Sequence, residues 1–419
     1  MRRSAPGALQ AIEVESGTGL EDDAPVKVEH FKCIGSYNWV DAPQPTILVP
    51  GAPPEWRDRP LPFRVPFDSG LQIFDPNGYY MGSASTLTPL FRAVDAVAED
   101  NADTTMDWSA VDFVLDRSSL RKILRWVRSA DTSWTTNWNK ETKSNDSSAR
   151  RHPDPASEMR QKPQKGAGGV PDFRLDLQLG GKKTVLMERW DTRTCQYVHP
   201  PKYGCRTNFD DAATSPKQGC RSSKYHNRIV QYDLEGVRLV VRFEVDACNP
   251  VDEDPSELLA NLALSFASLP STPSPPPDQS GTDITVLRGG IQTPQSSLIE
   301  IATRSPKGLA THKWYETYTQ LFLSQTSHFY VAVHHNGLFT DLAKYRLASP
   351  KFERFERDPR MQRSLRQLVR VLGTIQRLVQ EHGQRGRLSL VCRQGRLELF
   401  ERDGDAGRLP DCELSRFGL

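Results

Sequence analysis

Three carboxylates occur at spacings that can place them on one side of a β-sheet. Residues 237–246 alternate between apolar and polar side chains, as a half-buried strand does, and Glu244 and Asp246 fall on the polar face. Residues 297–303 predict a second strand, in which Glu300 points away from its two isoleucine neighbours. If these strands are adjacent, the three carboxylates converge on a hard-oxygen site that suits Mg²⁺ or Mn²⁺. Because such ions assist attack on phosphate esters, the pattern indicates a metal-dependent phosphodiesterase.

Other interpretations of these residue types stay open. Acidic side chains on an exposed strand face are often only solvated, and Glu-x-Asp by itself is a weak pattern. Zinc is not expected, because no common finger has the spacing of Cys195, His199, Cys205 and Cys220. The sequence also has no glycine-rich phosphate loop, no nucleophile elbow and no His-Glu-x-x-His motif.

The composition limits the compartment and the class of protein. The chain has 419 residues and a formal net charge of +2, so any basic surface for a partner has to be local. No stretch has the length of an apolar membrane span, and the first residues lack the apolar core of a secretory signal. The seven cysteines follow no Cys-x-x-Cys spacing, which suits a reducing compartment without disulfides. We therefore expect a soluble protein of the nucleus or cytoplasm, with no membrane partner.

Periodic segments before and after the carboxylates predict the elements that position them. Residues 111–116 predict a strand that enters a helix over residues 117–127. Arg117 at this corner is a surface charge, an ion-pair partner or a phosphate clamp. Residues 173–190 predict a hairpin with a Gly-Gly turn, and residues 313–323 predict a helix that flanks the carboxylate strands. We expect an α+β fold with a mixed central β-sheet flanked by helices.

Changes in composition along the chain suggest its organisation. Residues 1–30 lack periodicity and predict a flexible tail. Residues 31–350 predict the main domain, with disordered insertions at about 131–170 and 250–290. Residues 351–419 predict a basic helix and a final hairpin that pack on the core. The arginines of this helix form its solvated face or, in a second interpretation, a surface for nucleic acid or an acidic partner.

Five separated segments occur in the order of a known set of motifs: Phe113–Arg117, Gly204–Asp210, Glu244–Asp246, Glu300–Ala302, and Lys313 with Gln320. In this order they resemble the motifs of the DXO-type (RAI-like) decapping nucleases, which remove aberrant RNA 5′ ends. The resemblance implies a restriction-endonuclease-like (PD-(D/E)XK-like) core and a Mg²⁺ or Mn²⁺ site made by Asp210, Glu244, Asp246 and Glu300. It implies that Arg117 and Gln320 bind the substrate phosphates. It also implies a catalytic set of Glu300, Asp246, Gln320 and Lys313.

Two residues depart from the pattern of this family. Ala302 stands where the family has a lysine that stabilises charge at the scissile phosphate, and Asp210 stands where a glutamate is usual. Loss of a catalytic group commonly lowers the rate by several orders of magnitude, and Lys307 or Lys313 could replace the lysine only by a different approach. The first hypothesis is a metal-dependent RNA 5′-end hydrolase or 5′–3′ exonuclease. The alternative is an inactive nuclease-fold protein that binds RNA ends or a protein partner.

The whole chain is also similar to a group of fungal proteins with the same Ser36–Trp39 and Pro50–Trp56 motifs. Members of this group often carry the label geranylgeranyl pyrophosphate synthetase. Such a synthase needs two Asp-rich helical motifs that hold diphosphate through Mg²⁺, and Asp210–Thr214 lacks the closing aspartate. The strand-rich pattern also differs from an all-helical bundle, and therefore we do not expect this activity.

Overall fold

The computed structural model describes residues 7–14, 24–100, 106–131, 134, 170–201, 204–250 and 284–418. Within these ranges, no helix has the length and apolar character needed to cross a membrane.

The larger of two main sheets is mixed and contains eleven strands among the described residues. At its centre, β7 runs parallel to both β9 and β13, while β13 pairs antiparallel with β12. The strand order is β1 (Gln10–Ile12), β20 (Arg396–Glu401), β19 (Leu388–Arg393), β8 (Phe173–Gly180), β9 (Thr184–Trp190), β7 (Phe113–Asp116), β13 (Val237–Glu244), β12 (Ser223–Leu234), β2 (Val28–Val40), β3 (Thr46–Gly51) and β15 (Thr285–Gly290).

The smaller main sheet is also mixed, because β16 runs parallel to β17 and antiparallel to β14. Its order is β11 (Thr214–Ser215), β4 (Glu55–Trp56), β14 (Ala247–Cys248), β16 (Leu298–Arg304), β17 (His328–His335), β18 (Leu338–Arg346) and β5 (Phe63–Arg64). A two-stranded sheet pairs β6 (Gly70–Ile73) with β10 (Cys195–Val198).

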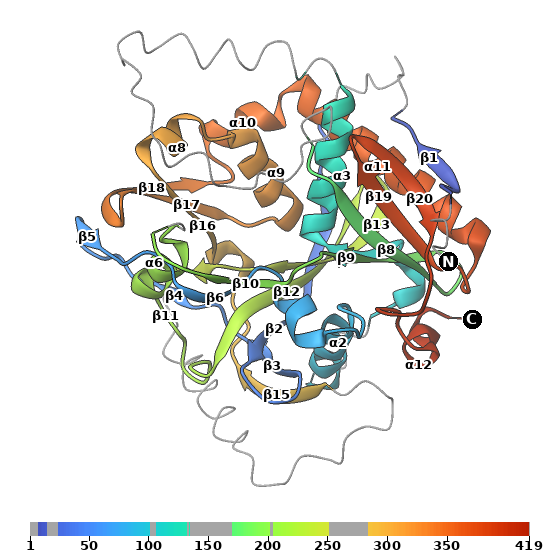
Figure 1. Ribbon diagram of the computed structural model, residues 1–419, viewed down its shortest axis with the longest axis horizontal. Coiled ribbons are helices and arrows are strands. Elements are labelled where there is room, and N and C mark those ends of the chain that lie inside the picture. The colour runs from blue at the N-terminus through green and yellow to red at the C-terminus, as the bar shows by residue number, and fades with distance from the viewer. Residues whose placement is uncertain are drawn as a thin grey trace.

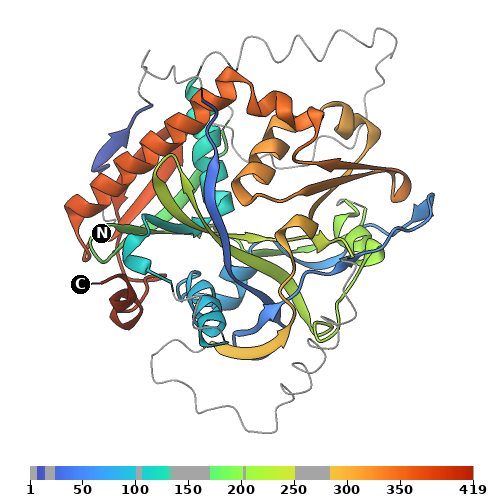
Figure 2. The same ribbon diagram turned by 180° about the vertical axis from the view of Figure 1, so that it is seen from behind.

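Helices cover the sheets and join them through one core. Buried side chains of α3, α9 and α11 form a single apolar cluster with strands of both main sheets, and α2 packs on the opposite face of the larger sheet. Figure 1 shows α3 and α9 side by side near the centre, and Figure 2 shows the length of α11 from behind. The helices are α1 (Pro76–Met81), α2 (Thr88–Asp100), α3 (Arg117–Ala130), α6 (Arg206–Ala213), α8 (Pro306–Ala310), α9 (Trp314–Ser324), α10 (Pro350–Glu356), α11 (Pro359–His382) and α12 (Asp411–Leu414), with 3₁₀ turns at Trp108–Ala110, Gln295–Ser297 and Ser415–Phe417.

The α+β class and the mixed strand pairing are confirmed, but the strands form two large sheets and not one central sheet. The hairpin predicted at residues 173–190 consists of β8 and β9. The helices predicted at residues 117–127 and 313–323 are α3 and α9. The restriction-endonuclease-like core stays a prediction.

Several predicted boundaries differ from the structure. Gln10–Ile12, which the prediction placed in a flexible tail, forms β1 because it pairs with β20. Thr285–Gly290, which fell in the second predicted insertion, pairs in parallel with β3. Most of the two predicted insertions, at 135–169 and 251–283, lies outside the described residues. Residues 351–419 supply β19, which pairs with β8, so they complete the larger sheet and do not merely pack on it.

The strand β13 is buried on both faces, whereas the alternation of its residues predicted one polar face. Leu239 and Val241 pack toward α3, and Val240 packs on the other side with the cluster that contains α2. The Arg242 side chain is fully buried and makes two hydrogen bonds to Asp116, at 2.7 and 3.0 Å. Asp116 lies opposite Arg242 in the register of β7 and β13, and therefore this arginine can be buried inside the sheet.

Candidate functional site

The chain passes from the larger main sheet to the smaller one at Asp246. β13 ends at Glu244, and β14 begins at Ala247, whose partner in β16 is Ile299. An Asp246 carboxylate oxygen accepts a hydrogen bond of 2.7 Å from the backbone N–H of Ile301. β13 and β16 therefore belong to different sheets, whereas the predicted convergence of the carboxylates required them to be adjacent strands. The corner at Asp246 brings the end of β13 to β16 instead.

Glu300 lies on the face of β16 that packs toward α9, and both groups predicted to bind the substrate contact it. Nη1 of Arg117, the first residue of α3, lies 3.0 Å from Glu300 Oε2. Nε2 of Gln320, on α9, donates a hydrogen bond to the other carboxylate oxygen of Glu300. Arg117 also donates to the Ser324 hydroxyl at 3.2 Å. The two predicted phosphate-binding side chains and the predicted catalytic carboxylate therefore lie together.

The helix α6 adds a further acidic residue to this site and a cation that the sequence analysis missed. Phe209 is buried and anchors α6 against the smaller sheet, so that Arg206 and Asp210 lie on neighbouring turns. Arg206 Nε lies 2.5 Å from Asp210 Oδ2, and Arg206 Nη2 lies 2.8 Å from Asp246 Oδ2. The spacing of Arg206 and Asp210, inside a segment that resembles a nuclease motif, is the signal that could have identified this arginine.

The four acidic residues of this site differ in how readily they lose a proton. Although Glu244 is exposed to solvent, desolvation by the protein around it raises the pKa of its carboxyl to about 7, against the opposing effect of Arg206. Burial also raises the pKa values of Asp210 and Asp246, and Arg206 again opposes this effect. Burial acts in the same direction on Glu300, but Arg117, Arg206 and Gln320 together hold its pKa below the ordinary value.

The arrangement is a cluster of hard-oxygen donors that arginines neutralise. Among the residues that the structure describes, no three His, Cys, Asp or Glu side chains are grouped so that they could hold a metal ion. The Arg206 guanidinium instead links Asp210 to Asp246. The second carboxylate oxygen of Asp210 is buried and has no hydrogen-bond partner within the same ranges. Such an oxygen would gain from a cation beside it.

The lysines considered as substitutes for the family lysine lie elsewhere in the described structure. Ala302 is buried in the main core, on the same strand as Glu300. Lys313 is exposed and caps the start of α9, seven residues before Gln320, which corresponds to about 10 Å along a helix. Lys307 lies in the short helix α8 and makes no side-chain contact with the four carboxylates that the described ranges record. The cation that contacts this cluster from α6 is Arg206.

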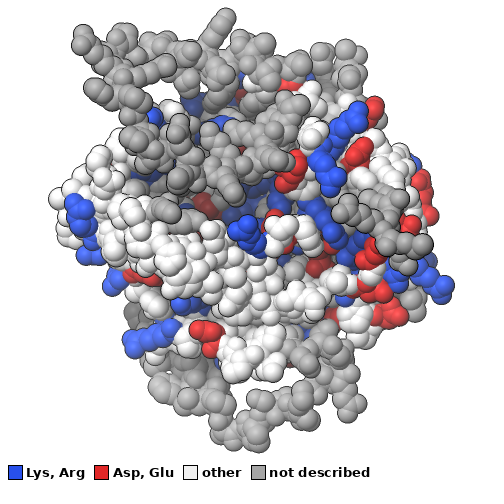
Figure 3. Space-filling model, in the orientation of Figure 1, with Lys and Arg blue, Asp and Glu red and all other residues white. Residues whose placement is uncertain are grey.

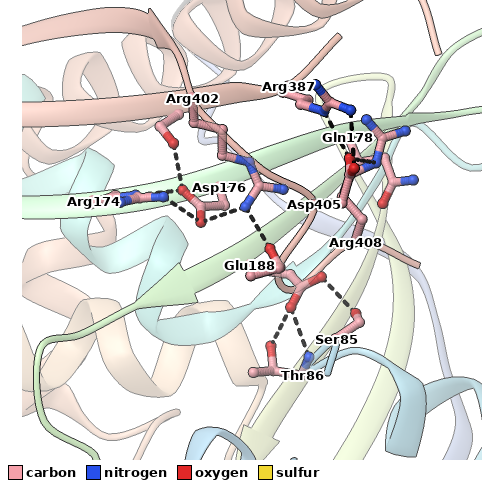
Figure 4. Close-up of polar contacts among 12 residues, drawn as sticks. Ser85, Thr86, Arg174, Asp176, Gln178, Glu188, Arg387, Arg402, Asp405 and Arg408 are labelled. Carbon is pink, nitrogen blue, oxygen red and sulfur yellow. Dashed lines mark hydrogen bonds and ion pairs between the residues drawn. The ribbon is translucent and has the colours of Figure 1, made fainter. Parts of the chain in front are cut away.

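A second group of carboxylates, which includes the buried Glu188 and the partly buried Asp176, lies between β8, β9 and the C-terminal segment (Figure 4). The Glu188 carboxylate accepts hydrogen bonds from the Ser85 hydroxyl at 2.6 Å and from the backbone N–H and hydroxyl of Thr86 at 2.7 and 2.9 Å. Burial nevertheless raises the pKa of Glu188 to about 7. Nearby, Asp176 pairs with Arg402 at 3.0 Å. Every partner in this group is a fixed part of the fold, which is typical of a structural network.

One family pattern and several solved structures match the chain. The family described as "Domain of unknown function (DUF8563)" matches residues 19–136 and 160–396. No curated protein sequence matches the chain significantly.

The matching solved structures include Rai1 proteins of two yeasts. Scheffersomyces stipitis Rai1 in complex with (3′-NADP)⁺ and calcium ion matches with a TM-score of 0.55 and 10% identity, covering 94% of each chain. Rai1 of S. pombe in complex with 3′-FADP matches with a TM-score of 0.51 and 13% identity, covering 91% of this chain and 98% of that chain. At such low identity the likeness concerns the fold alone, and it confirms the RAI-like fold that the motifs implied.

Proposed function

The chain belongs to the family described as a domain of unknown function, DUF8563, and on this premise, with the Rai1 fold, we propose that it is a divalent-metal-dependent hydrolase of RNA 5′ ends. It acts as a decapping nuclease or 5′–3′ exonuclease. The observation that carries the proposal is the gathering of Asp246, Glu300 and Asp210 at the joint of the two sheets, with Arg117 and Gln320 on Glu300. Acidic and phosphate-binding groups at one point are what phosphodiester hydrolysis requires.

The donor set fits Mg²⁺ or Mn²⁺ in its chemistry. Asp210, Glu244, Asp246 and Glu300 offer carboxylate oxygens, which these ions prefer, and one oxygen of Asp210 lacks any partner in the described part of the chain. Burial raises the pKa values of Glu244 and Asp246, so a cation beside these carboxyls would favour their charged forms. When bound, a divalent ion supplies Lewis-acid stabilisation of the charge that develops on a scissile phosphate. The calcium ion in the Scheffersomyces stipitis Rai1 complex supports this choice of ligand.

The residues of this chain bind and orient the substrate in the proposed reaction. Arg117 and Gln320 present N–H donors next to Glu300, where they can hold the phosphate oxygens of an RNA 5′ end. Arg206 supplies a cation beside Asp246, although Ala302 provides none from β16. Nucleotide ligands in the two yeast Rai1 complexes support a substrate of this class.

A second candidate function is the binding of RNA ends, or of a protein partner, without cleavage. Ala302 and the two ion pairs of Arg206 favour it, because an arginine that already neutralises Asp210 and Asp246 leaves less need for a metal ion. Lys313, predicted as catalytic, is exposed at the start of α9. We further propose, from the sequence resemblance, that the core is of the PD-(D/E)XK type, that the chain represents a fungal branch and that it acts in the nucleus or cytoplasm.

The proposal is tested by product release from labelled RNAs with triphosphate, monophosphate and capped 5′ ends, in Mg²⁺ or Mn²⁺. We expect the wild type to cleave at least one of these ends. Glu300→Ala should lower the rate by about a thousandfold, since it removes a metal ligand and the partner of Arg117. Glu401→Ala, which removes an exposed carboxylate on β20, is the matched control and should cleave as the wild type does.

The variant Ala302→Lys separates the two candidate functions. Cleavage by Ala302→Lys alone would show a competent fold and metal site, and would assign binding without cleavage to the natural chain. If none of the proteins cleaves, and neither Mg²⁺ nor Mn²⁺ raises the melting temperature, the hydrolase proposal is wrong.

A further inference from the structure

The helix α3 carries a row of arginines that starts at Glu300. Arg117, Arg121 and Arg125 are four residues apart, so they lie on one face of the helix, about 6 Å from one to the next along its axis. This face lies toward α9, because Arg117 contacts Ser324 and Arg125 contacts Glu316, both on α9. Figure 3 shows Lys and Arg side chains gathered in the middle of the face on which α3 lies in Figure 1.

The described residues place too few carboxylates beside this row to neutralise it. Glu316 lies 2.7 Å from Arg125, 2.8 Å from Arg128 and 3.9 Å from Arg121. Glu300, 3.0 Å from Arg117, is shared with Gln320 and is also influenced by Arg206. Within the described part of the chain, four arginines of α3 therefore share two carboxylates, which leaves positive charge in excess along the helix.

Arg121, in the middle of the row, has the weakest set of contacts. Its Nε is buried and has no hydrogen-bond partner among the residues with described positions, and its ion pair with Glu316 is long, at 3.9 Å. Burial and the neighbouring Arg125 and Arg117 lower the pKa of Arg121 to about 9. The Arg121 side chain is 20% exposed, and the Arg125 side chain is 37% exposed. An anion from solution can therefore reach the exposed parts of the Arg121 and Arg125 side chains.

We propose that Arg117, Arg121 and Arg125 form a track that binds consecutive phosphates of single-stranded RNA behind the 5′ end held at Glu300. This inference rests on the proposed function and specifies how its substrate lies. The regular spacing of guanidinium groups, which bind phosphate oxygens in a bidentate manner, favours a phosphodiester chain over a carboxylate peptide.

Aromatic rings at the far end of the row add a second reason to choose RNA. The Tyr315 and Trp134 rings lie 5.4 Å apart, and the Arg128 guanidinium lies 4.9 Å from the centre of the Tyr315 ring. Basic side chains followed by aromatic rings are typical of proteins that bind single-stranded nucleic acid, because bases stack on the rings.

The track is tested by the dependence of affinity on RNA length. Binding of uridine 5′-monophosphate and of a 5′-phosphorylated decanucleotide of oligo(U), each with a 3′ fluorophore on a phosphate-free linker, is measured by anisotropy in EDTA, where cleavage is excluded. We expect the wild type to bind the decanucleotide more tightly. Arg121→Ala should weaken this binding about tenfold and that of the mononucleotide much less, since only the longer chain has a phosphate that reaches Arg121. The slope of log affinity against log salt concentration for the decanucleotide should also become shallower by about one.

Three further variants keep the result interpretable. Arg121→Lys keeps the charge but loses the bidentate geometry, so its affinity should lie between those of the wild type and Arg121→Ala. Arg125→Ala, at a more exposed position, should show the same dependence on length and serves if Arg121→Ala fails to fold. Arg377→Ala removes a partly exposed arginine that is paired with Glu381 on α11, and it should bind as the wild type does.

The outcomes distinguish this inference from the proposed function. If the wild type binds and cleaves RNA but Arg121→Ala and Arg125→Ala bind both lengths normally, only the track is wrong. If the wild type binds neither RNA and also cleaves none in Mg²⁺ or Mn²⁺, both proposals fail. If poly-glutamate displaces the decanucleotide more effectively than unlabelled oligo(U) of equal charge, the surface binds an acidic protein, and the RNA assignment is overturned.

Discussion

Glu188 and Glu244 have carboxyl pKa values near 7, yet their surroundings are opposite. Glu188 is buried and accepts hydrogen bonds from Ser85 and Thr86, all parts of the same rigid framework. Glu244 is exposed and, within the described ranges, its carboxylate makes no hydrogen bond; Arg206 acts on it only from a distance. A raised pKa therefore does not identify a functional carboxylate by itself. The absence of fixed donors around Glu244, among the described residues, is what distinguishes the candidate site from the structural network.

The largest expected effect separates the two regions by stability. Glu188→Ala should lower the free energy of unfolding by about 2 to 3 kcal/mol, because it leaves the buried donors of Ser85 and Thr86 without an acceptor. Glu244→Ala should change it by less than about 0.5 kcal/mol, since no bond is lost. Urea denaturation at neutral pH measures both. Equal losses for the two variants would remove the distinction between a structural and a functional carboxylate.

A smaller effect concerns the cation of the site. Arg206→Ala should destabilise the protein by about 1 kcal/mol, because the Arg206 side chain is 38% exposed and solvent screens its ion pairs. Mn²⁺ should then raise the melting temperature of Arg206→Ala more than that of the wild type, since Asp210 and Asp246 have lost their neutralising partner.

Lys182→Ala, which removes an exposed lysine in the turn between β8 and β9, is the control for this experiment. It should respond to Mn²⁺ as the wild type does and keep RNA hydrolysis within about twofold. If Mn²⁺ stabilises Arg206→Ala no more than the wild type, then Arg206 and the metal do not compete for the same carboxylates.

The smallest effect is a difference in pH dependence. Folded-state pKa values near 7 lie above the ordinary glutamate value of 4.5, so both groups contribute stability that is complete below pH 4.5 and is lost as pH rises through 7. Glu188→Gln should remove the part of this pH-dependent loss of stability that comes from Glu188, and Glu244→Gln should remove the part that comes from Glu244. Mn²⁺ should abolish only the part that Glu244→Gln removes, because the proposed ion binds at that group. Unfolding free energies from about pH 5 to about pH 8 measure this, and an effect of Mn²⁺ on both parts would contradict it.

Local periodicity was sufficient to predict the elements that carry Arg117 and Gln320, because α3 and α9 each bury one apolar stripe. It was not sufficient for β13. There, the alternating pattern suggested an exposed Arg242, but its partner Asp116 is 126 residues away in sequence. Long-range pairing of this kind leaves no periodic signal, and so the burial of Arg242 could not be predicted from the strand alone.

The candidate site shows the same limit. The sequence indicated which carboxylates belong together, but it suggested adjacent strands, whereas the structure joins Asp246 to Ile301 across a corner between two sheets. Arg206 had no predicted role, although it is the one basic residue in Gly204–Asp210. Its spacing to Asp210 is local information that the sequence does contain.

Because the chain passes from one sheet to the other at Asp246, the separation of the carboxylates in the site depends on the angle between the two sheets. Glu244 ends β13 in one sheet and Glu300 lies on β16 in the other, so any rotation between the sheets changes the separation of these carboxylates. Conversely, a ligand that bridges Glu244 and Glu300 fixes that angle. Hydrogen exchange in β14 and β16 should therefore slow when such a ligand binds, because the ligand would hold the two sheets together.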